Sequence, residues 1–316
     1  MNQDQPLISI IVPVYNEEKV LEELYRRLSE AMGRIEDPWE LILVDDGSVD
    51  DSARIIQQLH EQDPRVKGIS FSRNFGFQEA VTAGLTYARG QAVILSDADL
   101  QDPPEVIPDM VEQWKEGSDV VYGVRSHREG ETWFKKLTAL AFYRLIRRIT
   151  NVEIPVDTGD FRLMDRRVVN AILRMPERNR FLRGMVPWVG YEQSGLPYER
   201  EARYAGESKF KSVKQMLPFA IDAITSFSYF PLQLATIFGF IIAGISLIAI
   251  IAVIILRVFG PTGELSGQAT TLVAVLFLGG VQLISLGIIG EYLGRIYDEV
   301  KGRPLFLVDR TWGIED

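Results

Sequence analysis

The sequence predicts an α/β domain with a mainly parallel sheet, followed by two membrane-spanning helices. In the first two-thirds of the 316 residues, short apolar runs alternate with amphipathic segments, as in strands joined by right-handed crossover helices. Acidic residues follow three of these runs, and ligands bind at the carboxyl ends of parallel strands. The last third contains two uncharged stretches, each longer than the roughly 20 residues that cross a bilayer.

Apolar periodicity defines the strands and helices of the predicted sheet domain. The run Leu7–Val14 is almost continuously apolar, which is typical of a parallel strand buried on both faces. Asn16 is expected to cap the next helix, and Asp102 to cap a later helix whose first turn contains two prolines. The full prediction is, in order, strand Leu7–Val14, the helix after Asn16, strand Glu40–Val44, helix Ala53–Leu59, strand Val66–Phe71, helix Gln78–Ala88, strand Ala92–Leu95, the helix from Asp102 and strand Asp119–Val124.

Composition restricts the chemistry that this chain can perform. The formal net charge of −9 disfavours nucleic-acid binding, so an enzyme of this charge needs local basic residues and a cation to hold phosphates. The absence of cysteine excludes disulfides, zinc–thiolate sites, iron–sulfur clusters and cysteine nucleophiles. The two histidines, His60 and His127, are too few for a multi-histidine metal site. We therefore expect chemistry based on carboxylates, arginine, lysine and a metal ion.

Asp97 and Asp99, after the fourth predicted strand, are the strongest functional signal. Mg²⁺ prefers oxygen ligands, keeps several waters and often completes its shell with substrate phosphates. A cation held here would stabilise the charge on a leaving nucleoside diphosphate. An isolated Asp-x-Asp more often serves a turn or a helix cap, but acidic residues after two other strands favour the metal. We therefore predict a Mg²⁺ or Mn²⁺ site at Asp97 and Asp99.

The segment Asp45–Ser48, after the second predicted strand, has two compatible interpretations. Asp and Ser side chains are typical of a turn that caps the following helix. Asp46 is also a candidate for hydrogen bonding to the base or ribose of a nucleotide.

Several motifs in a fixed order resemble the family 2 glycosyltransferases, which have a GT-A fold. These motifs are Val12–Glu18, Val44–Ser48, Arg73–Gly76, Ser96–Glu105, Asp157–Leu163, Arg180–Met185 and Arg203–Phe210. More narrowly, they are similar to those of polyprenyl-phosphate glycosyltransferases, which include dolichyl-phosphate mannose synthase and bactoprenol glucosyltransferase. Arg180–Met185, Trp188 and the paired C-terminal spans favour the bactoprenol branch. The resemblance covers essentially the whole chain and implies a GT-A (Rossmann-like) catalytic domain.

The resemblance also implies roles for individual residues. On the donor side these are Pro13, Tyr15, Glu17 and Asp46 for the nucleoside, Asp97 and Asp99 for the metal and diphosphate, and Gln101 near the transferred sugar. The implied phosphate-binding residues are Arg203, Ser208 and Lys209. Arginine offers bidentate geometry to phosphate and lysine a point charge, which supports this assignment beside a membrane; solvated surface charge is the alternative.

A carboxylate is also expected beside the acceptor. We expect Asp157 in this role, with Asp160 second, and count both with Asp99 as candidate catalytic residues. A lipid monophosphate has a second pKa of about 6, so it is largely ionised near neutral pH and hardly needs a general base. The carboxylate is therefore expected to orient the acceptor or to take a residual proton. The alternative is that one of these residues caps a turn around Gly159.

The two uncharged stretches, Phe230–Leu256 and Leu265–Gly290, are predicted membrane spans. The loop Arg257–Glu264 carries one basic residue and the outer flanks carry several, so positive-inside bias places both termini in the cytoplasm. The polar, acidic N-terminus indicates no signal peptide, and we expect a cytoplasmic catalytic domain on the inner membrane. Because two spans enclose little, we expect a homo-oligomer. The predicted segments are the catalytic domain 1–208, an interfacial helix 209–226, the spans 227–292 and a cytoplasmic tail 293–316.

Two basic amphipathic segments, 133–149 and 209–219, are candidates for lying on anionic lipid. For each of them, an ordinary helix packed on the catalytic domain is the alternative.

The expected reaction is transfer of a hexose from a nucleotide-sugar to a polyprenyl phosphate, with inversion. Resemblance to the bactoprenol branch favours UDP-glucose as donor and undecaprenyl phosphate as acceptor. The alternatives are a GDP-mannose-dependent enzyme similar to dolichyl-phosphate mannose synthase and a non-catalytic scaffold that binds nucleotide-sugar. A processive synthase is disfavoured because no Gln-x-x-Arg-Trp motif is present, and a pyrophosphorylase because its Gly-rich N-terminal loop is absent.

Overall fold

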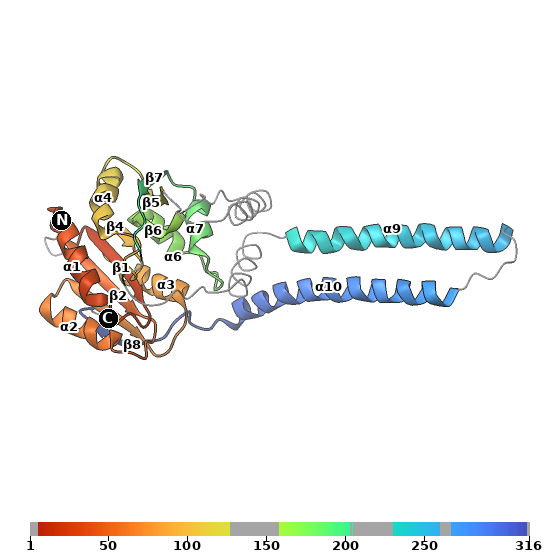
Figure 1. Ribbon diagram of the computed structural model, residues 1–316, viewed down its shortest axis with the longest axis horizontal. Helices are drawn as coiled ribbons and strands as arrows, with labels where there is room; N and C mark the ends of the chain where they lie inside the picture. Colours follow the sequence, from red (N-terminus) through yellow and green to blue (C-terminus); the bar gives the residue numbers. More distant parts are fainter. Residues whose placement is uncertain (1–5, 127–157, 203, 205–229, 260–266, 315–316) are drawn as a thin grey trace. The chain divides into compact units, whose positions relative to one another are not determined.

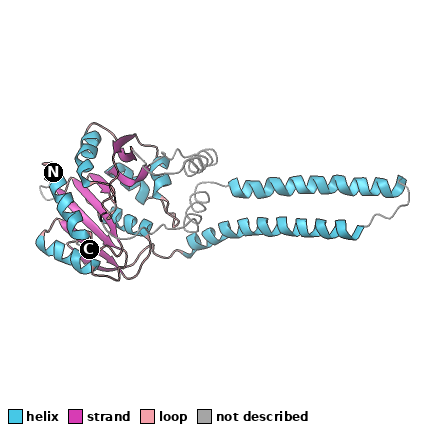
Figure 2. Cartoon of the chain, in the orientation of Figure 1, coloured by secondary structure: helices cyan, strands magenta, loops and turns pink. Residues whose placement is uncertain are grey.

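A computed structural model of the chain describes residues 6–126, 158–202, 204, 230–259 and 267–314 (Figure 1). The chain divides into two compact units, one formed by Met1–Ala223 with Arg303–Asp316 and the other by Ile224–Gly302. The first unit contains a sheet with helices, and the second contains a pair of long helices (Figure 2).

The α/β unit is built on an eight-stranded sheet in the part of the chain that the structure describes. All strands except β6 and β8 point the same way, which confirms the predicted mainly parallel sheet. The strand order is β7-β5-β6-β4-β1-β2-β3-β8. The strands are β1 (Ile8–Val14), β2 (Trp39–Asp45), β3 (Val66–Phe71), β4 (Ala92–Leu95), β5 (Val120–Arg125), β6 (Thr158–Asp165), β7 (Gln193–Tyr198) and β8 (Val308–Trp312).

Helices lie between these strands; those before residue 116 correspond to the four predicted helices, whereas the two within residues 166–188 were not predicted. In the α/β unit they are α1 (Leu21–Met32), α2 (Ser52–Gln62), α3 (Phe77–Tyr87), the 3-10 helix η1 (Pro104–Val106), α4 (Ile107–Lys115), α6 (Arg166–Leu173) and α7 (Leu182–Trp188). Leu24 and Leu28 of α1 share one hydrophobic cluster with Ile10 of β1. The next residue, Ile11, faces the opposite side, where its side chain leaves no room for a Cβ at Gly84 of α3. Helices therefore cover both faces of β1, which explains its continuous apolar run.

The carboxyl ends of β1, β2 and β4 reach the same edge of the sheet. β1 pairs parallel with β2, with Val14 opposite Asp45, and parallel with β4, with Ile11 opposite Leu95. The predicted donor-side residues follow these strands directly, so this edge carries the candidate site.

The predicted cap of α1 is wrong. α1 begins at Leu21, with Val20 at the N-cap position and no side-chain cap. Asn16 instead adopts a positive φ of 55°, and its Oδ1 accepts a hydrogen bond from the backbone N of Val49 at 2.9 Å. Its side chain therefore links the turn after β1 to the turn after β2, a contact that local spacing does not reveal.

The predicted cap at Asp102 is also wrong. Pro103 precedes η1 at the N-cap position and no side chain caps that helix; of the two prolines, Pro104 stands in its first turn. Asp102 is buried and instead accepts a hydrogen bond from the hydroxyl of Tyr198 at the end of β7. The predicted helix is present nevertheless, with α4 following η1.

Strand β8 was not predicted. It pairs antiparallel with β3 at the edge of the sheet, with Trp312 opposite Gly68. A Cβ at Gly68 would lie 2.4 Å from the Trp312 ring, so the glycine makes room for this indole. The residues after the second long helix thus complete the sheet that begins at the N-terminus.

The second unit consists of α9 (Phe230–Phe259) and α10 (Gly267–Lys301). By length and composition both are candidate membrane spans, over Phe230–Ile248 and Phe277–Lys301. Large apolar side chains such as Phe240 are mostly exposed along them, unlike those of a soluble core helix.

Several predictions fall outside the described residues. They concern the amphipathic segments 133–149 and 209–219 and the site residues Asp157, Arg203, Ser208 and Lys209. The four predicted segment boundaries also stay predictions.

Candidate functional site

The Asp46 carboxylate organises the loop that follows β3. It is 3% exposed and accepts hydrogen bonds from the side-chain amide of Asn74 at 2.9 Å and from the backbone N of Phe75 at 2.7 Å. The backbone N of Gly76 donates to it as well, at 3.0 Å. Three donors from one loop therefore converge on one carboxylate, which fixes the loop before any ligand arrives.

Gly47 allows this close approach. Its φ is 68°, and a Cβ there would lie 2.4 Å from the carbonyl carbon of Arg73. Any other residue would be strained and would also clash with backbone, so the Asp-Gly pair and the loop after β3 belong together.

Asp45 forms the turn after β2, as one interpretation of its segment predicted. Its Oδ1 accepts a hydrogen bond from the backbone N of Ser48 at 2.9 Å, and its Oδ2 accepts one from the Ser70 hydroxyl at 2.7 Å. The predicted helix cap is wrong, because Asp51 is the N-cap residue of α2 and no side chain caps that helix.

The turn after β1 is joined to the turn after β2. The backbone N of Asn16 donates to the Ser48 hydroxyl at 2.9 Å, and that of Glu17 donates to the Ser52 hydroxyl at 3.0 Å. The predicted nucleoside residues Pro13, Tyr15 and Glu17 are half-buried and lie on this shared edge with Asp46. Their proposed contacts with a nucleoside stay a prediction.

A second group of carboxylates lies at the end of β4. Asp97 is half-buried, while Asp99 and Asp160 are buried. Burial, and after it the carboxylates of Asp160, Asp102 and Asp99, together raise the pKa of Asp97 to about 8 against the opposing charge of Arg183. Negative charge is thus concentrated at this end of the sheet.

Asp160, on β6, is the carboxylate of this group whose negative charge is balanced by a bidentate ion pair with an arginine. Burial disfavours its charge, but Arg183, Arg162 and Arg125 together outweigh this effect, and the pKa of Asp160 is lowered. The Arg183 guanidinium from α7 donates to both carboxylate oxygens, at 3.0 and 2.6 Å. Arg183 belongs to the Arg180–Met185 motif, whose individual residues have no role that the sequence predicts, so its ion pair with Asp160 was not expected.

The residues at the β4 end fit a divalent cation bound together with a diphosphate. The described residues contain no group of three or more His, Cys, Asp or Glu side chains that could hold a metal by themselves. Asp97 and Asp99 supply carboxylate oxygens, and Mg²⁺ is commonly held by one or two carboxylates plus substrate phosphates. The raised pKa of Asp97 indicates that a nearby positive charge would stabilise its ionised form.

Gln101 lies where the loop after β4 meets the segment after β7. Its backbone O accepts a hydrogen bond from the backbone N of Glu201 at 3.0 Å, and its side-chain Oε1 accepts one from Arg200 at 2.9 Å. The backbone N of Tyr204 donates to the backbone O of Asp99 at 3.4 Å. The segment leading to the predicted phosphate-binding residues therefore runs along the predicted metal loop.

The family model for glycosyl transferase family 2 matches residues 9–173. Relatives with full-length similarity include an uncharacterized glycosyltransferase of Bacillus subtilis (strain 168), 50% identical over 98% of this chain and 95% of the relative. Another is the bactoprenol glucosyl transferase of Shigella phage SfII, 44% identical over 96% of this chain and 98% of the relative.

Solved structures show more distant similarity. The glucosyl-3-phosphoglycerate synthase of Mycobacterium tuberculosis, solved with Mn²⁺, UDP-glucose and phosphoglyceric acid, has a TM-score of 0.47 and 19% identity, covering 68% of this chain and 76% of that one. The mannosyl-3-phosphoglycerate synthase of Rubrobacter xylanophilus has a TM-score of 0.47 and 16% identity, covering 69% and 71%.

The sheet topology, the motifs at its edge and the full-length relatives agree with one another. The predicted α/β GT-A class and the resemblance to bactoprenol glucosyl transferases are confirmed. This chain belongs to glycosyl transferase family 2.

Proposed function

We propose that this protein transfers a hexose from a nucleotide-sugar to a polyprenyl phosphate at the cytoplasmic face of a membrane. The observation that carries the proposal is the concentration of carboxylates at the end of β4 beside the preformed Asp46 loop. That arrangement suits a nucleoside diphosphate bound with a cation. The printed name of the Shigella phage relative supports a bactoprenol acceptor and glucose as the transferred sugar.

The proposed reaction is one in-line displacement at the anomeric carbon. A phosphate oxygen of the lipid forms a bond to this carbon as the bond to the diphosphate oxygen breaks, and the configuration inverts. The nucleoside diphosphate leaves with the electron pair of the broken bond. The ionised lipid phosphate hardly needs to lose a proton, so Asp157 or Asp160 acts by orienting the acceptor.

The residues divide between the two substrates. Pro13, Tyr15, Glu17 and Asp46 hold the nucleoside, Gln101 lies near the sugar, and Arg203, Ser208 and Lys209 hold the lipid phosphate. Asp97 and Asp99 would hold Mg²⁺ or Mn²⁺, which supplies positive charge to the leaving diphosphate. Holding two anionic substrates together in the correct geometry supplies much of the rate enhancement.

The membrane arrangement is supported by the connectivity of the sheet. β1 precedes α9 and α10, β8 follows them, and both strands belong to one sheet. A folded sheet lies on one side of a membrane, so two crossings return the chain to the side that it left. The basic residues that flank the spans make this side the cytoplasm. The exposed apolar surface of α9 and α10 supports association with lipid and with further copies of the chain.

Transfer of radiolabel into organic-extractable lipid tests this proposal. Purified protein is incubated with undecaprenyl phosphate or dolichyl phosphate and each of a panel of UDP- and GDP-sugars, with and without Mg²⁺. We expect metal-dependent label from UDP-glucose; label from GDP-mannose with dolichyl phosphate would instead support the mannose-transferring alternative. No lipid label from any donor, with nucleotide still bound by folded protein, would support the non-catalytic scaffold.

A further inference from the structure

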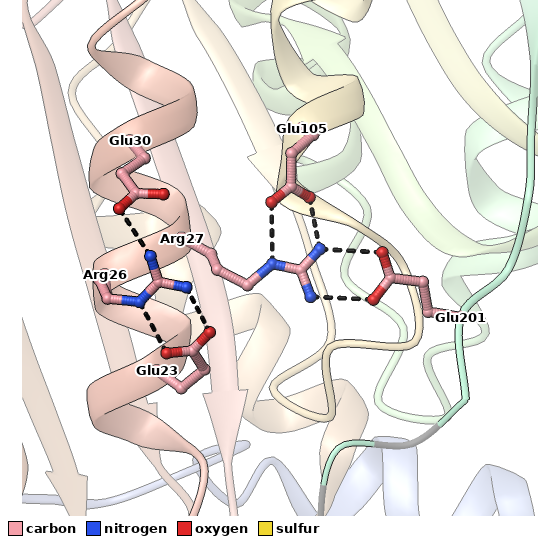
Figure 3. Close-up of polar contacts among 6 residues, drawn as sticks. All are labelled: Glu23, Arg26, Arg27, Glu30, Glu105 and Glu201. Atoms are coloured by element: carbon pink, nitrogen blue, oxygen red, sulfur yellow. Dashed lines mark hydrogen bonds and ion pairs between the residues drawn. The ribbon is translucent and has the colours of Figure 1, made fainter.

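Arg27 on α1 makes two bidentate ion pairs with carboxylates from different parts of the chain (Figure 3). It contacts Glu105 through Nε at 2.8 Å and Nη2 at 2.6 Å. It contacts Glu201 through Nη1 at 2.9 Å and Nη2 at 3.0 Å. Its side chain is 14% exposed, whereas the side chains of Glu105 and Glu201 are 37% and 47% exposed.

Glu105 and Glu201 lie in the two segments that meet at Gln101, which are the loop after β4 and the residues after β7. Glu105 lies in η1, directly after the loop that carries the candidate metal ligands. Glu201 follows β7, in the segment that leads to the predicted phosphate-binding residues. The Arg27 guanidinium therefore links two segments. One is residues 199–202 after β7, here called the acceptor-side segment, and the other is the end of the loop after β4 that carries Asp97 and Asp99.

The neighbouring residue Arg26 is arranged differently. Its guanidinium pairs with Glu23 and Glu30 at 2.6 Å each, and all three residues lie on α1 (Figure 3). Its side chain is 54% exposed, which makes these local pairs weak. Successive residues of a helix point in directions about 100° apart, so Arg26 lies along its own helix while Arg27 reaches the other segments. The chain thus supplies a matched control of the same residue type.

We propose that Arg27 is a positioning residue for the lipid-phosphate acceptor, because it fixes residues 199–202 against the loop 99–105. This inference rests on the proposed function for the identity of the acceptor. Two bidentate pairs fix the direction of each carboxylate as well as its distance, which a lysine at this position cannot do. Removal of the guanidinium leaves Glu105 and Glu201 facing each other, and their repulsion moves the acceptor-side segment away.

Steady-state kinetics of Arg27→Gln and Arg26→Gln test this role. The concentration of undecaprenyl phosphate is varied at saturating donor, and the donor at saturating lipid. We expect Arg27→Gln to raise KM for the lipid by about tenfold while KM for the donor changes by less than about twofold. Arg26→Gln should leave both values unchanged. Adding Glu201→Gln to Arg27→Gln removes the repulsion and should recover part of the lipid KM, whereas Arg27→Lys should recover little.

Equal changes in the two KM values, an unchanged lipid KM, or equal effects of the two arginine variants would overturn the assignment. Hydrogen exchange of the backbone amides of residues 199–202 provides a readout that does not depend on activity. Arg27→Gln should accelerate exchange there, and Arg26→Gln should not. If the wild-type protein transfers no sugar to lipid, the proposed function fails, and the exchange experiment still decides whether Arg27 holds this segment.

Discussion

The two ends of the candidate site treat buried negative charge in opposite ways. At the nucleoside end, Asp46 accepts hydrogen bonds from Asn74, Phe75 and Gly76, so protein donors stabilise its charge. At the β4 end, burial and the nearby carboxylates of Asp160, Asp102 and Asp99 raise the pKa of Asp97. A buried carboxylate whose charge is stabilised by hydrogen bonds from one loop holds that loop in place. A group of carboxylates that raise one another's pKa is instead suited to bind a cation. We call the first region, Asp46 with the loop Asn74–Gly76 that it orders, the scaffold, and we expect the second region to be the cation site.

The largest expected effect comes from Asp97→Asn, which acts on the expected cation site. Removing a candidate cation ligand should lower transfer by about 10³-fold, on the scale of losing a major electrostatic contribution to the transition state. The same change removes one charge from a crowded group of carboxylates, so the Tm should not fall. Transfer assays, differential scanning calorimetry and Mn²⁺ titration in the presence of UDP check this combination. A lower Tm with retained metal binding would show that Asp97 stabilises the fold and does not bind the metal.

Asp157→Asn extends the comparison to the acceptor side. We expect a decrease in kcat of about a hundredfold, because a group that orients the acceptor acts only when both substrates are bound. Nucleotide binding, measured by titration with UDP, should remain near the wild-type value. Unchanged turnover would show that Asp157 is not the acceptor-side carboxylate, and Asp160, held by Arg183, would become the remaining candidate.

Asp46→Ala changes the scaffold. Unlike Asp97→Asn, it should lower the stability of the protein as well as its function. It leaves the backbone N–H groups of Phe75 and Gly76 without their acceptor, which should lower the free energy of unfolding by about 2 kcal/mol. Nucleotide binding should weaken as the loop loses its order. Urea denaturation and UDP titration measure both effects. Full stability in Asp46→Ala would show that the loop does not depend on this carboxylate.

Local sequence patterns predicted β1 to β5 and the helices between them, because each depends on apolar periodicity within about ten residues. They yielded no prediction for β6, β7, α6 or α7. They did not predict β8, because its partner β3 lies more than 200 positions earlier and its own sequence, Val308–Trp312, has polar residues at its centre. The wrong caps have a similar cause. Asn16 and Asp102 are both typical capping residues by type, but each bonds to a segment that is distant in the sequence.

The same limit applies to the candidate site. Asp97 and Asp99 could be identified as candidate metal ligands because only Ala98 separates them and they follow a predicted strand. The role of Arg183 was not, because its partner Asp160 lies on another element. Arg27 stands in an ordinary amphipathic helix beside a second arginine, and only the folded chain distinguishes the two.

The smallest predicted effect concerns Phe306, which connects the C-terminal residues to the scaffold. Its ring stacks on Phe71 with centroids 5.1 Å apart, and Phe71 meets Phe75 edge-on at 5.7 Å. Phe306→Ala should therefore lower the free energy of unfolding by about 1 kcal/mol. It should also raise KM for the donor by about twofold, because Phe75 donates its backbone N–H to Asp46.

Leu307→Ala is the matched control for Phe306. The Leu307 side chain is 53% exposed, and its contribution to the edge of the sheet is a backbone O that accepts a hydrogen bond from Ser72, which truncation leaves in place. Stability and donor KM should therefore stay near wild-type values in this variant. If Phe306→Ala also leaves the donor KM unchanged while lowering stability, the C-terminal residues support the sheet but not the nucleotide loop. If Phe306→Ala lowers the free energy of unfolding and also raises the donor KM, the residues after α10 help to order the loop that Asp46 holds.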